Sequence, residues 1–422
     1  MSNHFQAFTI IVLYLYLFSD TKDNVVFRSF RDYNTTMFSV LKAIFMARLA
    51  LLKCRLRHSA GSDWPGDVAL SYCPDILTRL SRGVDCILVT GTNGKTTTAA
   101  MIRKIFSSKN IPVIANKEGA NLQSGMIVPF LRHCTPWGSS FRNVAVLECD
   151  EKWVPLAFRE VRPKYLVITN LSEDQEDRTG SPEELYQLLL SCVRKSDAVL
   201  CINEDCPVSG RMLKEELPNR IISFSAKGAD VIVNGEKYPA DLSIPGDYNL
   251  ENAAAAAAVC LPFGIPCEEA LSALKDFRAP FGRMETFSMD GVPVTICLTK
   301  NVVSADNVLS CIASLERKAQ VVFGFHTNIG DSADRIWIGK IGIRPGMDFL
   351  EGAIASGSCT EEIAEALSAH GYSCRKAKTS EGVIPIIRES SRPVYILASY
   401  SYMMEIRKLF VNAGYLKDFW KT

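Results

Sequence analysis

"CILVTGTNGKTTTAAMIRKIF", residues 86–106, joins an apolar run, a loop with two glycines and a segment with helical spacing. A strand that leads through such a loop into a helix N-terminus is typical of a phosphate site, because glycine lets backbone amides close around oxygen atoms. Lys95 can neutralise phosphate charge, and the Thr96 hydroxyl can hold Mg²⁺. Position 89 is valine, so the loop has the short form G-x-x-G-K-T. We predict a nucleotide-phosphate site here.

Apolar runs and helical segments alternate from residue 84 to about 260. This alternation predicts an α/β unit with a largely parallel sheet. The expected central strands are DCILVTG, NVAVLECD, KYLVITN and DAVLCIN. Between them, Ser181 and Pro182 open a helix over 181–196 as its cap and first residue.

A second α/β pattern follows FRAPFGRMETF, residues 277–287. Its expected strands are VPVTICLT, AQVVFGF and PVYILASYS, with helices over 304–317 and 360–370. The chain therefore reads as two α/β units joined near residue 282.

Acidic residues follow the strand ends where an α/β sheet places its ligands. LECDE supplies Glu148, Asp150 and Glu151 as candidate oxygen ligands for Mg²⁺, and Asn170 follows the next strand. A solvated acidic turn is the alternative for each of them.

The N-terminal region does not read as a membrane span. The apolar run over 8–18 is too short for one, and no cleavage site follows it closely. Residues 37–57 have helical apolar spacing with basic residues interspersed, which fits either a helix on an anionic membrane surface or one packed on its own domain. The first 36 residues match nothing, and we expect Met37 to be the initiator.

Composition excludes some classes of function. A formal charge of +1 over 422 residues gives no reason to expect a nucleic-acid partner. Fourteen cysteines without paired spacing, in a chain too large to need disulfides, predict free thiols in a reducing cytoplasm. Cys201 and Cys206 lie close together, but no second pair follows at ligand spacing, so we predict buried thiols and no zinc.

Several motifs resemble the Mur ligase superfamily, whose members make amide bonds through an acyl-phosphate. VTGTNGKTTTA looks like its ATP-binding loop, GDYNLENAAAA its central-domain motif and FGRME its domain-junction arginine motif. NKEGANLQSGM, TNLSEDQEDRTG, LTKNVVSADNVL and HTNIGDSADRIWIG are similar to one branch, the MurT-type subunits of lipid II isoglutaminyl synthase. The likeness runs from about Met37 to the C-terminus.

The resemblance implies a fold and a division of the chain. We expect a Mur ligase-like central P-loop domain with a parallel sheet, followed by a C-terminal α/β Rossmann-like domain. The expected segments are an N-terminal extension over 1–36, a helical lead-in over 37–83, the ATP-binding domain over 84–282 and the C-terminal domain over 283–422.

The resemblance to this family also implies a reaction. ATP would phosphorylate the α-carboxylate of D-glutamate in the lipid II stem peptide, and ammonia would attack the acyl-phosphate to give D-isoglutamine. Thr96 and Glu148 would hold Mg²⁺, and Lys95 and Lys300 would act at the phosphate and the acyl-phosphate. The residues expected at the nucleotide are Thr92, Asn93, Gly94, Lys95, Thr96, Thr97, Asn249, Asn252, Arg283 and Asn301.

The implied partner is a GatD-type glutaminase that forms a heterodimer with this chain and supplies ammonia. Asp331 or Asp334 would complete the partner's site, and Asp334 is the weakly preferred choice. MurT proteins commonly carry a four-cysteine zinc ribbon after the segment matching INEDCP, so a shortened insert is expected here. The protein would work in the cytoplasm, at the inner membrane face where its lipid substrate lies.

Two alternatives remain open. The chain could be another Mur-type ligase that joins an amino acid, against which GANLQSGM and HTNIGDSAD argue. It could also be a nucleotide-binding scaffold without catalysis, since Val302 and Gly339-Lys340 depart from the family pattern. Dependence on ammonia, rather than on an amino acid, would distinguish the proposed reaction from the first alternative. ATP binding without turnover would indicate the second alternative.

Overall fold

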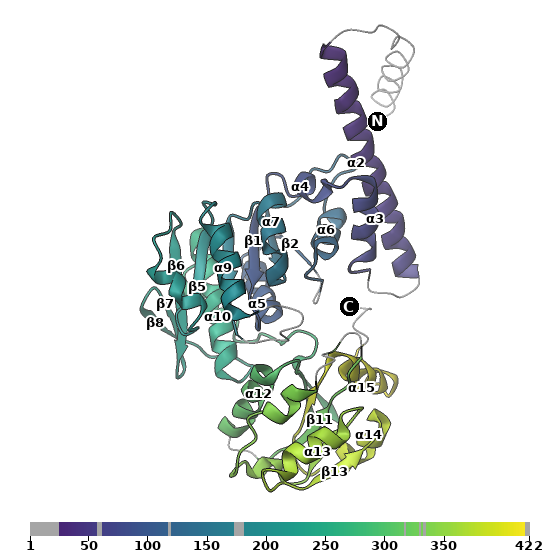
Figure 1. Cartoon of the computed structure of the whole chain (residues 1–422), viewed down its shortest axis with the longest axis vertical. Coiled ribbons are helices and arrows are strands. Elements are labelled where there is room, and N and C mark those ends of the chain that lie inside the picture. Colours follow the sequence, from purple (N-terminus) through teal and green to yellow (C-terminus); the bar gives the residue numbers. More distant parts are fainter. Residues whose placement is uncertain are drawn as a thin grey trace.

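A computed structural model describes residues 25–56, 61–116, 120–172, 181–315, 318–328, 331 and 335–417, with side chains from residue 37 onward. Two sheets organise these residues into two bodies, one above the other in Figure 1. The first sheet lies within residues 85–239 and the second within 283–398. The domain boundaries predicted above remain a proposal that fits this arrangement.

The first sheet has eight strands in the order β2-β3-β1-β4-β5-β6-β7-β8. The pairs from β2 to β6 are parallel, and the last two pairs are antiparallel. The strands are β1 Asp85–Thr90, β2 Val113–Ala115, β3 Val144–Glu148, β4 Tyr165–Ile168, β5 Val199–Asn203, β6 Ile221–Lys227, β7 Asp230–Val233 and β8 Glu236–Pro239. The expected parallel sheet is thus extended by an antiparallel edge.

Both faces of this sheet are covered, because neighbouring residues of a strand point to opposite sides. Cys86 and Leu88 of β1 pack on one face and Ile87 and Val89 on the other. The first face is covered by α2 Val25–Leu56, α3 Trp64–Tyr72, α4 Ile76–Leu80, α6 Gln123–Arg132, α7 Val154–Glu160 and α9 Pro182–Val193. The second is covered by α5 Lys95–Ser108, α10 Asp247–Cys260 and α11 Cys267–Ser272.

The second sheet has the order β13-β12-β11-β14-β10-β9, parallel except for β9 with β10. Its strands are β9 Arg283–Met289, β10 Val292–Leu298, β11 Gln320–Gly324, β12 Ala353–Ser356, β13 Cys374–Ala377 and β14 Val394–Ala398. Helices α12 Val302–Ser314 and α13 Thr360–Ser368 cover one face, and α14 Ser380–Arg388 and α15 Tyr400–Asn412 the other. The predicted α/β class of both bodies is confirmed.

Local sequence accounts for the element ends. The Ser181 hydroxyl accepts the Glu184 N–H, and the Glu184 carboxylate accepts the Ser181 N–H, so α9 begins with a capping box as the sequence indicates. The helical spacing noted over residues 37–57 falls in α2, which begins before it at Val25. No helix among the described residues is both long and apolar enough to cross a bilayer.

Candidate active site

The β1–α5 loop has the backbone form that a phosphate cradle requires. Gly91 has φ +128° and Gly94 has φ +86°, a region that L side chains rarely adopt. A Cβ on Gly91 would lie 2.2 Å from Thr169 Oγ1, and one on Gly94 would lie 2.3 Å from Asn252 Oδ1. Only glycine fits at either position, and the free amides at the α5 N-terminus suit an anion.

The two residues that follow strand β4 hold this loop in place. Asn170 accepts the Asn93 N–H through Oδ1 at 3.0 Å and donates from Nδ2 to the Asn93 carbonyl at 3.1 Å. The Thr169 hydroxyl donates to the same carbonyl at 2.6 Å. The loop shape is therefore fixed from outside, and Thr169 is a supporting residue that the sequence did not single out.

Lys95 is buried at the first position of α5. Its ammonium group donates to the Gly91 carbonyl and forms a 3.0 Å ion pair with the buried Glu151 carboxylate. Burial alone would lower the pKa of Lys95, but the Glu151 and Glu148 carboxylates raise it above its ordinary value. Lys95 therefore carries its charge at neutral pH.

Glu148 and Thr96 form a second buried contact beside this lysine. The Thr96 hydroxyl donates to Glu148 Oε1 at 2.9 Å. The Asn116 side chain accepts the Glu148 N–H at 2.9 Å and donates to its carbonyl at 2.8 Å, which fixes the end of β3. Burial raises the pKa of Glu148, against the opposing effect of Lys95 and the Thr96 hydrogen bond.

This donor set fits Mg²⁺. Magnesium prefers oxygen ligands and is usually held by one or two carboxylates, with water and substrate phosphate in the remaining positions. Thr96 supplies a hydroxyl and Glu148 a carboxylate at the end of the phosphate loop. Thr96 and Glu148 are the two residues expected from the sequence to hold the metal.

Helix α10 lines another wall. Asn252 accepts the Thr98 hydroxyl at 3.1 Å and donates to Asn249 Oδ1 at 3.5 Å, so the two predicted asparagines contact one another across one helical turn. Both side chains are buried and border the cleft.

The second body closes the cleft, whose volume is about 530 Å³. Arg283 and Lys300 line it from this side, and their positive charges oppose the rise in the pKa of Glu148 that burial causes. The predicted residues that border the cleft are Thr92, Asn93, Gly94, Lys95, Thr96, Thr97, Glu148, Asp150, Glu151, Asn249, Asn252, Arg283, Lys300 and Asp331.

Asn301 does not border the cleft. Its Oδ1 accepts the Ser304 N–H at 2.8 Å, and Ser304 Oγ accepts the Asn301 N–H at 3.1 Å. These bonds form the capping box at the start of α12, so the structure gives Asn301 a helix-capping position.

Asp331 lies at the cleft wall against the start of α15. Its Oδ1 accepts the Ser401 N–H at 3.0 Å, and the Ser401 hydroxyl donates to its other oxygen. Asp334, the preferred candidate for the partner site, lies outside the described residues.

All fourteen cysteines fall within the described residues and are free thiols. Cys201 is buried in β5, and burial raises the pKa of its thiol to about 12. The Cys206 sulfur accepts the Leu171 N–H at 3.3 Å. Both thiols therefore pack inside the first body, and the chain after Cys206 continues into the antiparallel edge β6–β8.

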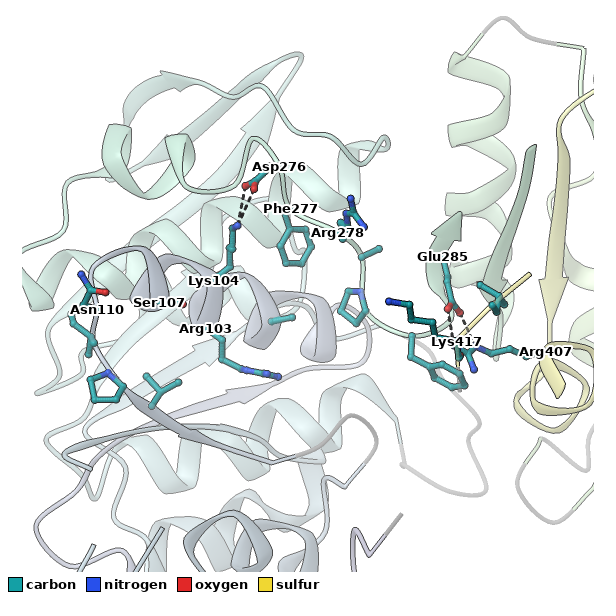
Figure 2. Close-up of a pocket in the computed structure, with 18 of the residues that line it drawn as sticks. Arg103, Lys104, Ser107, Asn110, Asp276, Phe277, Arg278, Glu285, Arg407 and Lys417 are labelled. Carbon is teal, nitrogen blue, oxygen red and sulfur yellow. Dashed lines mark hydrogen bonds and ion pairs between the residues drawn. The ribbon is translucent and has the colours of Figure 1, made fainter. Parts of the chain in front are cut away.

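Residues 277–281 form the link between the two bodies. This link runs along a groove that is separate from the cleft and is also lined by residues of α5 (Figure 2). Lys104 pairs with Asp276 at 3.0 Å before the link, and Arg407 pairs with Glu285 at 2.9 Å after it. The Arg407 guanidinium also lies 4.5 Å from the ring centre of Phe281, within the link. Each end of the link is thus bound to its own body.

Comparisons with known proteins agree with the fold described above. Residues 89–260 match the Mur ligase middle domain family. The fold is similar to that of the MurF ligase from Thermotoga maritima, solved in complex with ADP, with a TM-score of 0.62, 15% identity and coverage of 82% of this chain and 84% of that one. Residues 89–260 thus form a Mur ligase middle domain, and the predicted resemblance to the Mur ligase superfamily, a class of ATP-dependent ligases, is confirmed.

Within that class, the chain is similar to one kind of subunit. It is 28% identical over 412 residues to subunit MurT of lipid II isoglutaminyl synthase (glutamine-hydrolyzing) from Staphylococcus aureus strain COL, covering 84% of this chain and 90% of that protein. It is 26% identical over 426 residues to the MurT subunit from Streptococcus pneumoniae, covering 84% and 94%. The predicted resemblance to MurT subunits is confirmed.

Proposed function

We propose that this protein is the ligase subunit of a lipid II isoglutaminyl synthase. It would use ATP to phosphorylate the α-carboxylate of D-glutamate in the lipid II stem peptide. Ammonia would then displace phosphate from the acyl-phosphate and give the amide of D-isoglutamine. The MurT relatives, which match over most of both chains, support this choice among Mur-type reactions.

The observation that carries the proposal is the buried group of Lys95, Thr96 and Glu148 at the glycine loop. Bound Mg-ATP supplies the phosphoryl group. The backbone amides of residues 94–97 and the Lys95 ammonium group would hold its phosphates, and Thr96 and Glu148 would hold the metal. Asn249 and Asn252 would position the nucleotide from α10.

The opposite wall would receive the carboxylate substrate. Arg283 and Lys300 place positive charge across the cleft from Glu148. These charges would stabilise the negative charge that develops on the reacting group. Closure of the two bodies would exclude water, which competes with ammonia for an activated carboxylate. Lys300 is therefore proposed to stabilise the acyl-phosphate.

The proposal includes a GatD-type glutaminase as the source of ammonia, in a heterodimer with this chain. The MurT relatives are described as subunits of a glutamine-hydrolysing enzyme, which supports a partner of this kind. Asp334 remains the preferred residue for the partner site, since both oxygens of Asp331 already accept bonds from Ser401. The reaction would take place at the cytoplasmic membrane face.

The test is phosphate release from ATP with lipid II and either ammonium or single amino acids as acceptor. Turnover that requires ammonium supports the proposal. Turnover with an amino acid would favour another Mur-type ligase. ATP binding without turnover under any condition would indicate that the protein is a nucleotide-binding scaffold without catalysis.

A further inference from the structure

Helix α2 has an inner apolar face that attaches it to the first body. Its buried residues are Val40, Ala43, Ile44, Ala47, Ala50 and Cys54. They recur at helical spacing and join the core cluster that covers the sheet. This packing fixes the orientation of α2.

The opposite side of α2 is apolar as well. Its large exposed residues, with their exposed fractions, are Phe38 67%, Phe45 62%, Leu49 45%, Leu52 52% and Leu56 73%. At 3.6 residues per turn these five positions fall within an arc of about 60°, roughly opposite the buried face. We name these five residues the outer stripe. Scattered single apolar residues need no explanation, but a continuous stripe of this kind marks an interaction surface.

Basic residues flank the outer stripe. Lys42 and Lys53 lie about 50–70° from its centre on one side, and Arg55 lies about 90° away on the other. All three are exposed. Between residues 33 and 62 the sequence contains no aspartate or glutamate. The charged side chains that α2 itself places around the stripe are therefore all positive.

Arg48 does not belong to this surface. Its guanidinium donates to the backbone carbonyls of Leu131 and Cys134, so it anchors α2 to the first body. Lys53 lies 5.3 Å from the ring centre of Trp64, which is itself 45% exposed. A tryptophan at the edge of the stripe suits the boundary between lipid and water.

We propose that the outer stripe of α2 binds in the plane of an anionic lipid surface. An apolar stripe between basic flanks buries its side chains among acyl chains while the cations contact acidic headgroups. A second copy of this chain is the less suitable occupant, because packing stripe against stripe would bring the two sets of cations together. Charge complementarity thus selects the lipid.

The position of α2 gives this contact a consequence. Ser62 and Asp63, which follow the helix closely, line the nucleotide cleft. Docking of α2, seen beside the first body in Figure 1, would hold the cleft close to the membrane. The proposal goes beyond the proposed function, since it rests on surface chemistry and holds for any substrate.

The test is co-sedimentation of the full chain with phosphatidylcholine vesicles, with and without phosphatidylglycerol. We expect binding that requires the anionic lipid. Leu49→Gln with Leu52→Gln should weaken it at least about tenfold, because both side chains leave the acyl region. Lys42→Gln, Lys53→Gln and Arg55→Gln together should also weaken it at least about tenfold, since each cation contributes near the surface.

Matched controls lie elsewhere on the described surface. Ile336→Gln removes an exposed apolar residue of the second body, and Lys195→Gln, Lys227→Gln and Lys237→Gln remove three exposed cations of the first. Both controls should bind vesicles like the parent protein. Circular dichroism and the ATP-induced rise in Tm should be unchanged in every variant, which shows that the fold is retained.

Two results would overturn the proposal. One is absence of binding to anionic vesicles by the parent protein. The other is unchanged binding by folded stripe variants, which would assign the contact to another part of the chain. Loss of a dimer in the stripe variants, without any vesicle binding by the parent, would identify a second copy as the occupant. None of these results bears on ligase activity.

Discussion

Lys95 Nζ lies 3.0 Å from Glu151 Oε1, and the two side chains are only 9% and 2% exposed. The positive charge of Lys95, the proposed phosphate-binding lysine, is therefore balanced by a carboxylate of the protein itself. A buried charge without a partner is costly, so this pair keeps the lysine charged and in place. A bound phosphate would take over part of that neutralisation.

Glu151→Gln tests this relationship. Removing one partner of a buried pair should lower the free energy of unfolding by about 3 kcal/mol, because Lys95 stays charged in a dry site. Mg-ATP should raise Tm more in the variant than in the parent, since phosphate replaces the lost carboxylate. Thermal unfolding with and without Mg-ATP measures both effects.

Asp85→Asn is the matched control, because Asp85 pairs with Lys164 at 2.9 Å on the surface. This exposed pair should contribute about 1 kcal/mol or less. If Glu151→Gln destabilised the protein no more than Asp85→Asn, the importance assigned to the buried pair would be wrong.

Gly94→Ala should disrupt the phosphate loop. The new Cβ would meet Asn252 Oδ1 at 2.3 Å, in a backbone region with φ +86°. Gly228 also has a positive φ but has no atom within 4 Å of its Cβ, so Gly228→Ala should cost only about 1–2 kcal/mol of backbone strain. Calorimetric titration with ATP should show lost affinity in Gly94→Ala alone. Equal ATP affinity in the two variants would contradict the close-packed cradle.

Thr96→Val removes the hydroxyl that donates to Glu148 at 2.9 Å while keeping the shape of the side chain. Because the Thr96 hydroxyl is a proposed Mg²⁺ ligand, the variant should need a Mg²⁺ concentration about 10–100-fold higher for half-maximal turnover. Ser107→Ala changes an exposed hydroxyl on the same helix and serves as the control. An unchanged magnesium requirement in Thr96→Val would remove this residue from the metal site.

The sequence predicts β1, β3, β4 and β5 of the first sheet and β10, β11 and β14 of the second, because buried parallel strands are continuous apolar runs. It gives no strand for β9, β12 and β13 of the second sheet. It misses β6 to β8, where exposed and buried residues mix and Glu236–Pro239 is largely exposed. Short strands such as Val113–Ala115 carry too few residues for a period to be visible. The early start of α2 is missed because Asp32 and the polar run Asn34-Thr35-Thr36 interrupt the apolar spacing before Met37.

The strand, glycine loop and helix over residues 86–106 are predicted correctly, since their spacing is local. The roles of more distant residues depend on three-dimensional packing. Glu151 belongs to a recognisable acidic motif, yet nothing in its spacing shows that it pairs with Lys95 rather than a metal. Asn301 looks like a site residue from its motif, but an asparagine three residues before Ser304 is also a helix-cap signal.

Glu405 should make stability depend on pH. Burial raises the pKa of its carboxyl, but hydrogen bonds from Ser380 and His326 outweigh this and hold the pKa below the usual 4.5. His326 Nδ1 accepts the Ser358 N–H, so Nε2 carries the proton and donates to Glu405 at 3.1 Å. The carboxylate thus favours the folded state above the unfolded-state pKa, and this contribution is lost as the pH falls through the lower folded-state pKa.

Glu405→Gln removes this dependence. The variant should have a lower Tm than the parent near neutral pH, and the gap should shrink as the pH falls below about 4.5. The effect should be modest, because the carboxylate is 43% exposed. Thermal unfolding over a pH series measures it, and a gap that stays constant or widens on acidification would contradict the assigned hydrogen bonds.

The central claim is amide formation on lipid II that depends on the phosphate loop. The most direct measurement is mass spectrometry of lipid II incubated with this protein, Mg-ATP and an ammonium salt, with Lys95→Ala as the blank. The account predicts the mass change of one carboxylate to an amide with the parent protein and none with Lys95→Ala. An unchanged lipid II mass in a sample where the parent binds ATP, or an equal change with Lys95→Ala, would contradict it.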